Sequence, residues 1–134
     1  MPEPPPSPQT ADIKGPGVIL VVDDDLQMRQ LIQAALEDEG LPVATAADGR
    51  QALRRAAQAR PVLVVLDITI PRVASSEVAT RLRATYGQGL PILVITADGH
   101  AAEKARQVGA YAYLKKPFEL DALIAAVEQG LGGA

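Results

Sequence analysis

The sequence predicts an α/β protein, a doubly wound (βα)5 three-layer sandwich in which helices cover both faces of a five-stranded parallel sheet. Short apolar runs alternate five times with segments whose apolar residues recur at helical spacing. The apolar runs are nearly continuous, which is typical of strands buried on both faces of a parallel sheet. The length of 134 residues fits one domain with its own core and is too short for two ordinary ones.

The first half of the chain contributes two strands and two helices to this prediction. An apolar run at residues 18–22 is followed by apolar residues at 28, 31, 32, 35 and 36, which share one face of a helix. That helix begins at Leu26 and ends before Gly40, which suits a helix end. A weaker strand at 42–46 and a turn at Asp48 and Gly49 precede a helix at 51–59, which Pro61 ends.

The central expected strand, residues 62–67, has the sequence VLVVLD and ends abruptly in a carboxylate. Its length and its β-branched residues favour a strand buried on both faces. Asp67 would then lie at the carboxyl end of a parallel strand, where open α/β sheets place their ligands. Taken alone, an aspartate at a strand exit is just as well explained as a turn or helix-capping residue.

The second half repeats the alternation with three helices and two strands. A helix at 76–85 ends at a Gly-Gln-Gly cluster, and a strand at 92–95 runs into Thr96. A short helix at 101–108, capped by Gly109, leads to a strand at 111–114 that ends at Lys115, Lys116 and Pro117. The last helix, 119–131, places apolar residues 120, 123, 124 and 127 on one face.

The two ends of the chain are expected to lie outside the domain, which covers residues 17–131. Residues 1–16 are rich in proline and poor in apolar side chains, so they cannot bury enough surface to offset the entropy of ordering and are expected to be disordered. Their use as a proline-rich ligand for a partner is a minor alternative. Residues 132–134 are expected to fray.

Composition narrows the function further. The absence of cysteine excludes disulfides and thiolate metal sites, and a single histidine excludes a histidine-rich metal centre. A net charge of −3 argues against a nucleic-acid partner. Neither a membrane-spanning apolar run nor a signal peptide is present, so the cytoplasm is the expected compartment and no membrane is an expected partner.

Polar residues follow four of the five expected strands. They are Asp23 and Asp24, Asp67, Thr96, and Lys116. Because the carboxyl ends of parallel strands meet at one edge, these side chains should lie together. Three carboxylates repel one another unless a cation joins them, and oxygen ligands of this kind suit Mg²⁺.

A metal, a lysine and a hydroxyl together favour binding of a phosphoryl group, and a carboxylate can attack phosphorus to form an acyl phosphate. Asp67, at the end of a rigid buried strand, is the expected nucleophile. Asp25 is expected to be only a helix N-cap or a solvated residue. Taken alone, Thr96 would be a strand-end hydroxyl and Lys116 a surface lysine. Their joint occurrence at the strand ends makes the ordinary readings improbable.

The chain resembles the response-regulator receiver domains of bacterial two-component signalling, and in particular single-domain regulators of the chemotaxis and sporulation type. Four motifs, in order, carry the resemblance over roughly residues 18–131: VVDDD at 21–25, VVLDITIP at 64–71, ITA at 95–97, and GAYAYLKKPF at 109–118. The resemblance implies a flavodoxin-like fold with strand order 2-1-3-4-5.

The resemblance also implies roles for individual residues. Asp67 would accept a phosphoryl group from a histidine kinase or phosphotransfer protein, assisted by Thr96 and Lys116. Mg²⁺ would be held by Asp24, Asp67 and the backbone carbonyl of Thr69, with Asp23 assisting. Thr96 and Tyr113 would form the switch pair.

Further expectations follow from the same resemblance. The 116–117 peptide bond would be cis, and residues 101–108, 111–114 and 119–131 would form the output face toward an unknown downstream protein. Beyond signalling, the activity would be limited to self-phosphorylation from small donors and slow self-dephosphorylation.

The sequence departs from the family pattern in two places. Ala74 and Ser75 stand where an acidic residue and glycine usually follow Pro71, so this loop is expected to follow another path. The chain between Thr96 and Gly109 is about two residues shorter than usual, so the helix there should be short or displaced. Thr69 and Asp98 occupy positions that tune dephosphorylation in the family.

Three alternatives remain open at this point. A non-phosphorylated pseudo-receiver would use the same fold as a protein-binding module. A phosphatase or ATPase with an aspartate nucleophile usually carries a second acidic residue two positions on, where Thr69 stands here. A DNA-binding transcription factor is disfavoured because no second domain follows Leu131, although the chain could be cut from a longer protein.

Overall fold

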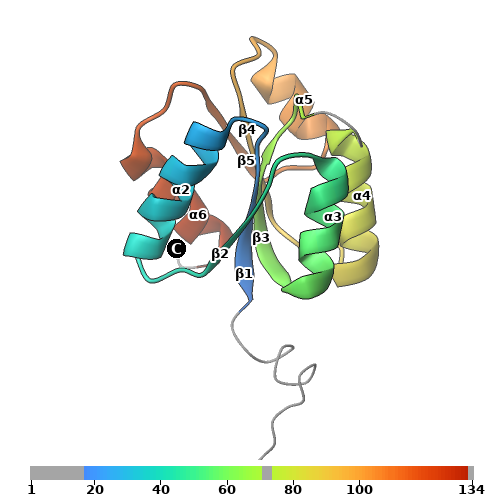
Figure 1. The fold of residues 1–134 in the computed structure, drawn as a ribbon. Coiled ribbons are helices and arrows are strands. Elements are labelled where there is room, and N and C mark those ends of the chain that lie inside the picture. Colours follow the sequence, from blue (N-terminus) through green and yellow to red (C-terminus); the bar gives the residue numbers. More distant parts are fainter. Residues whose placement is uncertain (1–16, 71–73, 133–134) are drawn as a thin grey trace, which may run out of the picture.

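A computed structural model describes residues 17–70 and 74–132 of the chain (Figure 1). The expected leader, the loop residues 71–73 that include Pro71, and residues 133–134 lie outside the described part. The strands are β1 Val18–Val22, β2 Val43–Ala46, β3 Pro61–Asp67, β4 Ile92–Thr96 and β5 Ala112–Lys115. The helices are α2 Leu26–Asp38, α3 Gly49–Gln58, α4 Ser75–Tyr86, α5 Ala101–Gln107 and α6 Leu120–Gly130.

The five strands form one parallel sheet in the order β2-β1-β3-β4-β5, as predicted. Helices α2 and α6 cover one face, and α3 and α4 cover the other (Figure 1). Alternate residues of each inner strand point to opposite faces: Leu20 and Leu66 pack under α3 and α4, whereas Ile19 and Val65 pack under α2 and α6. The nearly continuous apolar runs therefore reflect two separate cores.

The starts of two helices are fixed by aspartate side chains. The carboxylate of Asp25 accepts hydrogen bonds from the backbone N–H groups of Gln27 and Met28, which confirms the expected N-cap. Asp48 caps α3 in the same way through the N–H of Gln51. Because Asp48 is a cap, α3 begins at Gly49, two residues before the expected helix, and the predicted turn at Asp48 and Gly49 is instead the helix entry.

The segment after β4 is held at its far end by one arginine. Helix α5 is short, as expected. The guanidinium of Arg83, on α4, donates to the backbone carbonyls of Val108 and Gly109 at 2.6 and 2.7 Å. Gly109 has a φ of 68°, a conformation that glycine adopts without strain. The C-terminal end of α5 is therefore tied to α4.

The end of β5 also follows the expectation. The Lys116–Pro117 peptide bond is cis. None of the helices in residues 17–70 and 74–132 has the length and apolar character that crossing a membrane requires.

Tyr111 links the start of β5 to α6 and gives a prediction for alkaline pH. Its hydroxyl donates to the carbonyl of Ala126 at 2.6 Å, and burial raises its pKa from 10.0 to about 12. Because the pKa of Tyr111 is higher in the folded state, the folded protein keeps this proton more strongly than the unfolded chain. The resulting contribution to the free energy of unfolding is fully present below pH 10 and is lost as pH rises through 12. Tyr111→Phe should therefore lose about 1 kcal/mol at neutral pH, from the missing hydrogen bond.

The same substitution should flatten the fall in stability between about pH 10 and 12. Urea unfolding followed across that range measures both effects. Tyr113→Phe, two residues further along the chain, is the matched control because the side chain of Tyr113 is 45% exposed. Equal alkaline slopes for the native chain and Tyr111→Phe would contradict the prediction.

Candidate functional site

The predicted polar residues meet at the carboxyl edge of the sheet. Asp23 directly follows β1, Asp67 ends β3, Thr96 ends β4 and Lys116 follows β5. Neighbouring strands are paired in parallel register, and the backbone N–H of Lys116 donates to the carbonyl of Thr96 at 2.8 Å. The topology thus brings together residues that lie more than ninety positions apart in sequence.

Lys116 joins two buried carboxylates. Its Nζ lies 2.7 Å from Oδ2 of Asp23 and 3.0 Å from Oδ2 of Asp67. The side chains of Asp23 and Asp67 are 0% and 4% exposed, whereas that of Lys116 is 18% exposed. Two carboxylates therefore share one ammonium group, which leaves an excess of one negative charge when all three are ionised.

The pKa shifts of Asp23 and Lys116 reflect burial and the ion pairs between them, which act in opposite directions. Burial raises the pKa of Asp23, even though the hydrogen bond from Lys116 and the N–H of Asp25 act in the opposite direction. Burial alone would lower the pKa of Lys116, but its hydrogen bonds to Asp23 and Asp67 and their charges outweigh this and raise it. Lys116 is accordingly held in its charged form, and the pocket favours a further cation.

Asp24 completes an acidic cluster that is open on one side. Asp23, Asp24 and Asp67 each offer a carboxylate oxygen, and these oxygens lie within 4.8 Å of one another. Asp24 is exposed while the other two are buried. An all-oxygen donor set with a side open to water fits Mg²⁺, which binds one or two carboxylates and keeps several waters. Asp25 lies outside the cluster and serves α2 instead.

Each oxygen of Asp67 is held by a different partner. Oδ1 accepts hydrogen bonds from the backbone N–H and the hydroxyl of Thr69 at 2.9 and 2.8 Å, and Oδ2 contacts Lys116. The sequence predicted a backbone carbonyl ligand at Thr69 and a position that tunes dephosphorylation, but it did not predict the contact of the Thr69 hydroxyl with Asp67. A signal for this contact was available in the sequence. An aspartate side chain commonly accepts hydrogen bonds from the residue two positions on, and here that residue is a threonine.

Ser75 is a second residue that the sequence did not single out. Its side chain is buried, and its hydroxyl donates to the backbone carbonyl of Asp67 at 3.0 Å. This contact ties the first residue of α4 to the end of β3. From the sequence, Ala74 and Ser75 were recognised only as a departure from the family's loop. The contact of Ser75 was not predictable, because a hydrogen bond to a carbonyl eight residues away leaves no periodic pattern.

The hydroxyl of Thr96 is turned toward the loop that follows it. Thr96 is fully buried, and its Oγ1 accepts a hydrogen bond from the N–H of Asp98 at 3.0 Å. Asp98 in turn accepts from the N–H of His100 at 2.7 Å, and its Oδ2 lies 3.3 Å from Nζ of Lys104 on α5. The His100 N–H, followed by Lys104, lowers the pKa of Asp98.

Tyr113, predicted as the partner of Thr96 in a switch, lies on β5 opposite Val94. Its side chain is 45% exposed, in contrast to the buried Thr96. The two residues lie on neighbouring strands, two register positions apart, with one side chain inside and the other at the surface.

Comparison with known proteins gives concordant matches. The family model described as response regulator receiver domain matches residues 19–128. Response regulator MprA of Mycolicibacterium vanbaalenii is 46% identical over 109 residues, which are 80% of this chain and 47% of that protein. Response regulator MprA of Mycobacterium leprae is 42% identical over 111 residues, with 81% and 48% covered. The chain thus spans about half the length of these curated relatives.

Solved structures agree with the fold. Chemotaxis protein CheY4 of Vibrio cholerae superposes with a TM-score of 0.79 and 32% identity, over 87% of this chain and all of that chain. The receiver domain of NtrX from Brucella abortus has a TM-score of 0.77 and 34% identity, over 87% of this chain and 99% of that one.

Proposed function

The chain belongs to the response regulator receiver domain family, and from this membership and the geometry of the acidic edge we propose that Asp67 is its phosphoacceptor. The observation that carries the proposal is the buried carboxylate of Asp67, held between Lys116 at 3.0 Å and Thr69 at 2.8 Å beside an open acidic cluster. A histidine kinase or phosphotransfer protein in the same two-component pathway would supply the phosphoryl group.

The chemistry assigned to the residues is a single group transfer. A carboxylate oxygen of Asp67 forms a bond to the donor's phosphorus while the bond from phosphorus to the donor's leaving atom breaks, giving an acyl phosphate. Lys116, already charged, pairs with the added phosphoryl oxygens, and Thr96 donates its hydroxyl to one of them. Asp67 is fixed at a rigid strand end, which limits the entropy lost in positioning it.

We assign the metal site to Asp23, Asp24, Asp67 and the backbone carbonyl of Thr69. A Mg²⁺ ion bound there would supply positive charge against the incoming phosphoryl group. The excess negative charge of the cluster and its exposed Asp24 support this assignment. Asp24, as the exposed member, would contact the ion on the side open to water.

Signalling would follow from the hydroxyl of Thr96. Its oxygen accepts a hydrogen bond from the N–H of Asp98 at 3.0 Å, so a movement of this hydroxyl toward a phosphoryl group on Asp67 would also pull on the loop at Asp98. Tyr113 would then respond as the second member of the switch pair, and the change would alter the surface of α5, β5 and α6 that a downstream protein contacts. We place the protein in the cytoplasm, where such kinases present their phosphoryl groups.

The proposal is tested by incubating the native chain with acetyl phosphate and Mg²⁺ and measuring its intact mass. We expect a mass increase of one phosphoryl group that is absent from Asp67→Asn, which keeps the shape of the side chain but lacks the nucleophile. Chelation of Mg²⁺ should also suppress the increase.

The alternative of a non-phosphorylated pseudo-receiver predicts a different result. It gives no mass increase on the native chain under any of these conditions and no Mg²⁺ binding in a titration. That pair of outcomes would replace the phosphoacceptor proposal with a purely protein-binding role for the same fold.

A further inference from the structure

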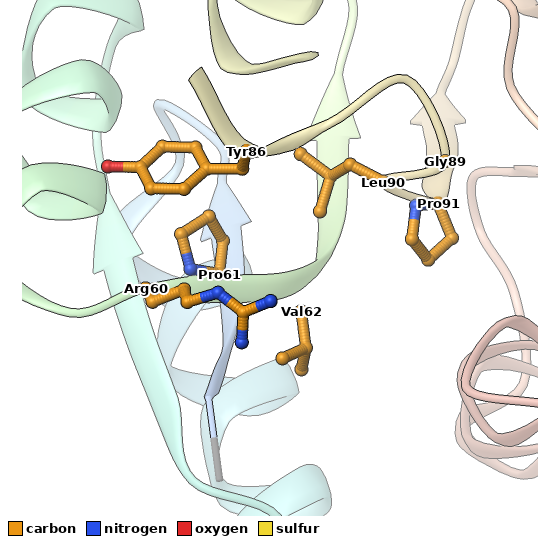
Figure 2. Close-up of a pocket in the computed structure, with 7 residues that line it drawn as sticks. All are labelled: Arg60, Pro61, Val62, Tyr86, Gly89, Leu90 and Pro91. Atoms are coloured by element: carbon orange, nitrogen blue, oxygen red, sulfur yellow. The ribbon is translucent and has the colours of Figure 1, made fainter. Parts of the chain in front are cut away.

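A small pocket opens at the edge of the sheet opposite the acidic cluster, where β3 and β4 begin. Its volume is about 240 Å³, which is below the ~300–1,000 Å³ of sites that hold drug-sized molecules. It therefore fits one or two side chains. Figure 2 shows the residues that line it: Arg60, Pro61, Val62, Tyr86, Gly89, Leu90 and Pro91.

The walls of this pocket suit a proline-rich segment. They combine polar and apolar surface: Pro61, Leu90 and Pro91 line the pocket together with Tyr86, whose hydroxyl donates to the carbonyl of Ala56 at 2.7 Å. Figure 2 shows the ring of Tyr86 above Pro61, with Leu90 and Pro91 across from them. Aromatic-lined surfaces bind polyproline segments, which are extended before binding and lose little entropy. Proline also brings no backbone N–H that an apolar wall would leave unpaired.

The sequence of the same chain contains such a segment near its first residue. Residues 2–8 read PEPPPSP and contain five of the eleven prolines in the sequence. The described structure begins at Gly17, at the rim of the pocket. The N–H of the next residue, Val18, donates to the carbonyl oxygen of Arg60 at 2.9 Å. Gly17 itself is so close that a Cβ atom added to it would lie 2.7 Å from the same oxygen.

The tether is short enough to make weak binding effective. The nine residue steps from Pro8 to Gly17 reach at most about 30 Å when fully extended. A segment tethered at this length experiences an effective concentration in the millimolar range. A contact of only millimolar affinity would therefore be substantially occupied.

We propose that this pocket is a binding site for proline-rich peptide and that residues 2–8 of the same chain occupy it. The prolines contact Tyr86, Leu90 and Pro91, and Glu3 lies near the exposed guanidinium of Arg60. The proposal does not depend on phosphorylation of Asp67, because the pocket lies at the other end of the strands.

The test uses a spin label on the full-length chain and NMR line broadening of backbone amides. Because the native chain has no cysteine, Thr10→Cys gives a unique label just after the proline segment. We expect the amides of Tyr86, Gly89 and Leu90 to broaden. A control with the same label and Pro4, Pro5 and Pro6 replaced by serine keeps the tether length and charge.

If the segment docks, the serine control should show several-fold less broadening than the native segment. A segment that is tethered but not docked would instead broaden the amides at the rim equally in both proteins. Equal profiles would overturn the proposal. Broadening that appears between a spin-labelled and a separate isotope-labelled molecule, at the same strength, would place the segment on a second copy and overturn the intramolecular assignment.

A variant on the pocket side locates the contact. A Cβ on Gly89 meets open space, so Gly89→Glu adds a bulky acid at the pocket that repels Glu3 without a steric clash in the fold. It should reduce the broadening to the level of the serine control. Gly99→Glu is the matched substitution, also in open space but at the other edge of the sheet. Broadening unchanged by Gly89→Glu would overturn the assignment to this pocket.

Discussion

Lys116→Met is expected to lower the free energy of unfolding at pH 7 by about 3 kcal/mol. The substitution keeps the aliphatic stem but removes the one ammonium group shared by two buried carboxylates, at 2.7 Å from Asp23 and 3.0 Å from Asp67. Removing one member of a buried ion pair commonly costs about 3–5 kcal/mol, and the partial exposure of Lys116 places the expectation at the lower end.

The loss should depend on pH in a defined direction. The pKa of Asp23 is already raised by burial, and loss of Lys116 removes interactions that oppose this rise. A carboxyl with a raised folded pKa contributes stability below its unfolded pKa of 3.8, and that stability is lost as pH rises through the folded pKa. The deficit of the variant should therefore shrink as the pH falls toward 3.8.

Urea unfolding at several pH values measures this effect. Lys115→Met removes the same charge from the neighbouring, exposed residue and should change the stability by no more than about 0.5 kcal/mol. Added Mg²⁺ should stabilise Lys116→Met more than the native chain, because the ion replaces the missing cation. If the two lysine variants lost the same stability, the role given to Lys116 in holding the carboxylates would be wrong.

Asp24→Asn is expected to weaken Mg²⁺ binding by at least about tenfold. Replacing even an indirect partner of a metal site costs about 10–100-fold in affinity, and Asp24 belongs to the cluster whose oxygens lie within 4.8 Å of one another. Stability without Mg²⁺ should change little or rise, because one of three mutually repelling carboxylates is removed. Phosphorylation by acetyl phosphate should slow with the loss of bound ion.

Asp25→Asn provides a closely matched control for this prediction. It removes the same charge from the next residue, and asparagine caps a helix about as well as aspartate does, so α2 keeps its start. Calorimetric Mg²⁺ titration of both variants should separate them clearly. A similar loss of affinity in both would mean that general negative charge, and not the position of Asp24, draws the ion to this edge.

The fold was predictable because its strands are buried on both faces. The continuous apolar runs at 62–66 and 92–95 are too short for buried helices. In a chain whose other segments have helical periodicity, they therefore predict strands of a parallel sheet. The sheet order rested on resemblance, since alternation alone leaves several orders possible. The missed start of α3 has a local cause: Asp48 and Gly49 suit a turn equally well, and only the hydrogen bond from Gln51 shows that Asp48 is a cap.

The candidate site was predictable to the level of which residues meet, and less so in how they face. Parallel topology alone places Asp23, Asp67 and Lys116 together, and the structure confirms their contacts. The direction of the Thr96 hydroxyl toward Asp98, and the contact of the Thr69 hydroxyl with Asp67, depend on the paths of individual loops. The spacing of Asp67 and Thr69 carried a signal for the second contact, whereas the rotation of the Thr96 hydroxyl leaves no pattern in the sequence.

The arginine that ties α4 to the end of α5 makes α5 behave as a short lever. Arg83 pins one end through two hydrogen bonds, and the seven residues of α5 extend about 10 Å from that pin toward Thr96. Sliding the helix along its axis would break both bonds, whereas swinging it about the pinned end would keep them. A displacement that began at Thr96 would therefore be converted into tilt, and this tilt would be largest at the end of α5 nearest Thr96.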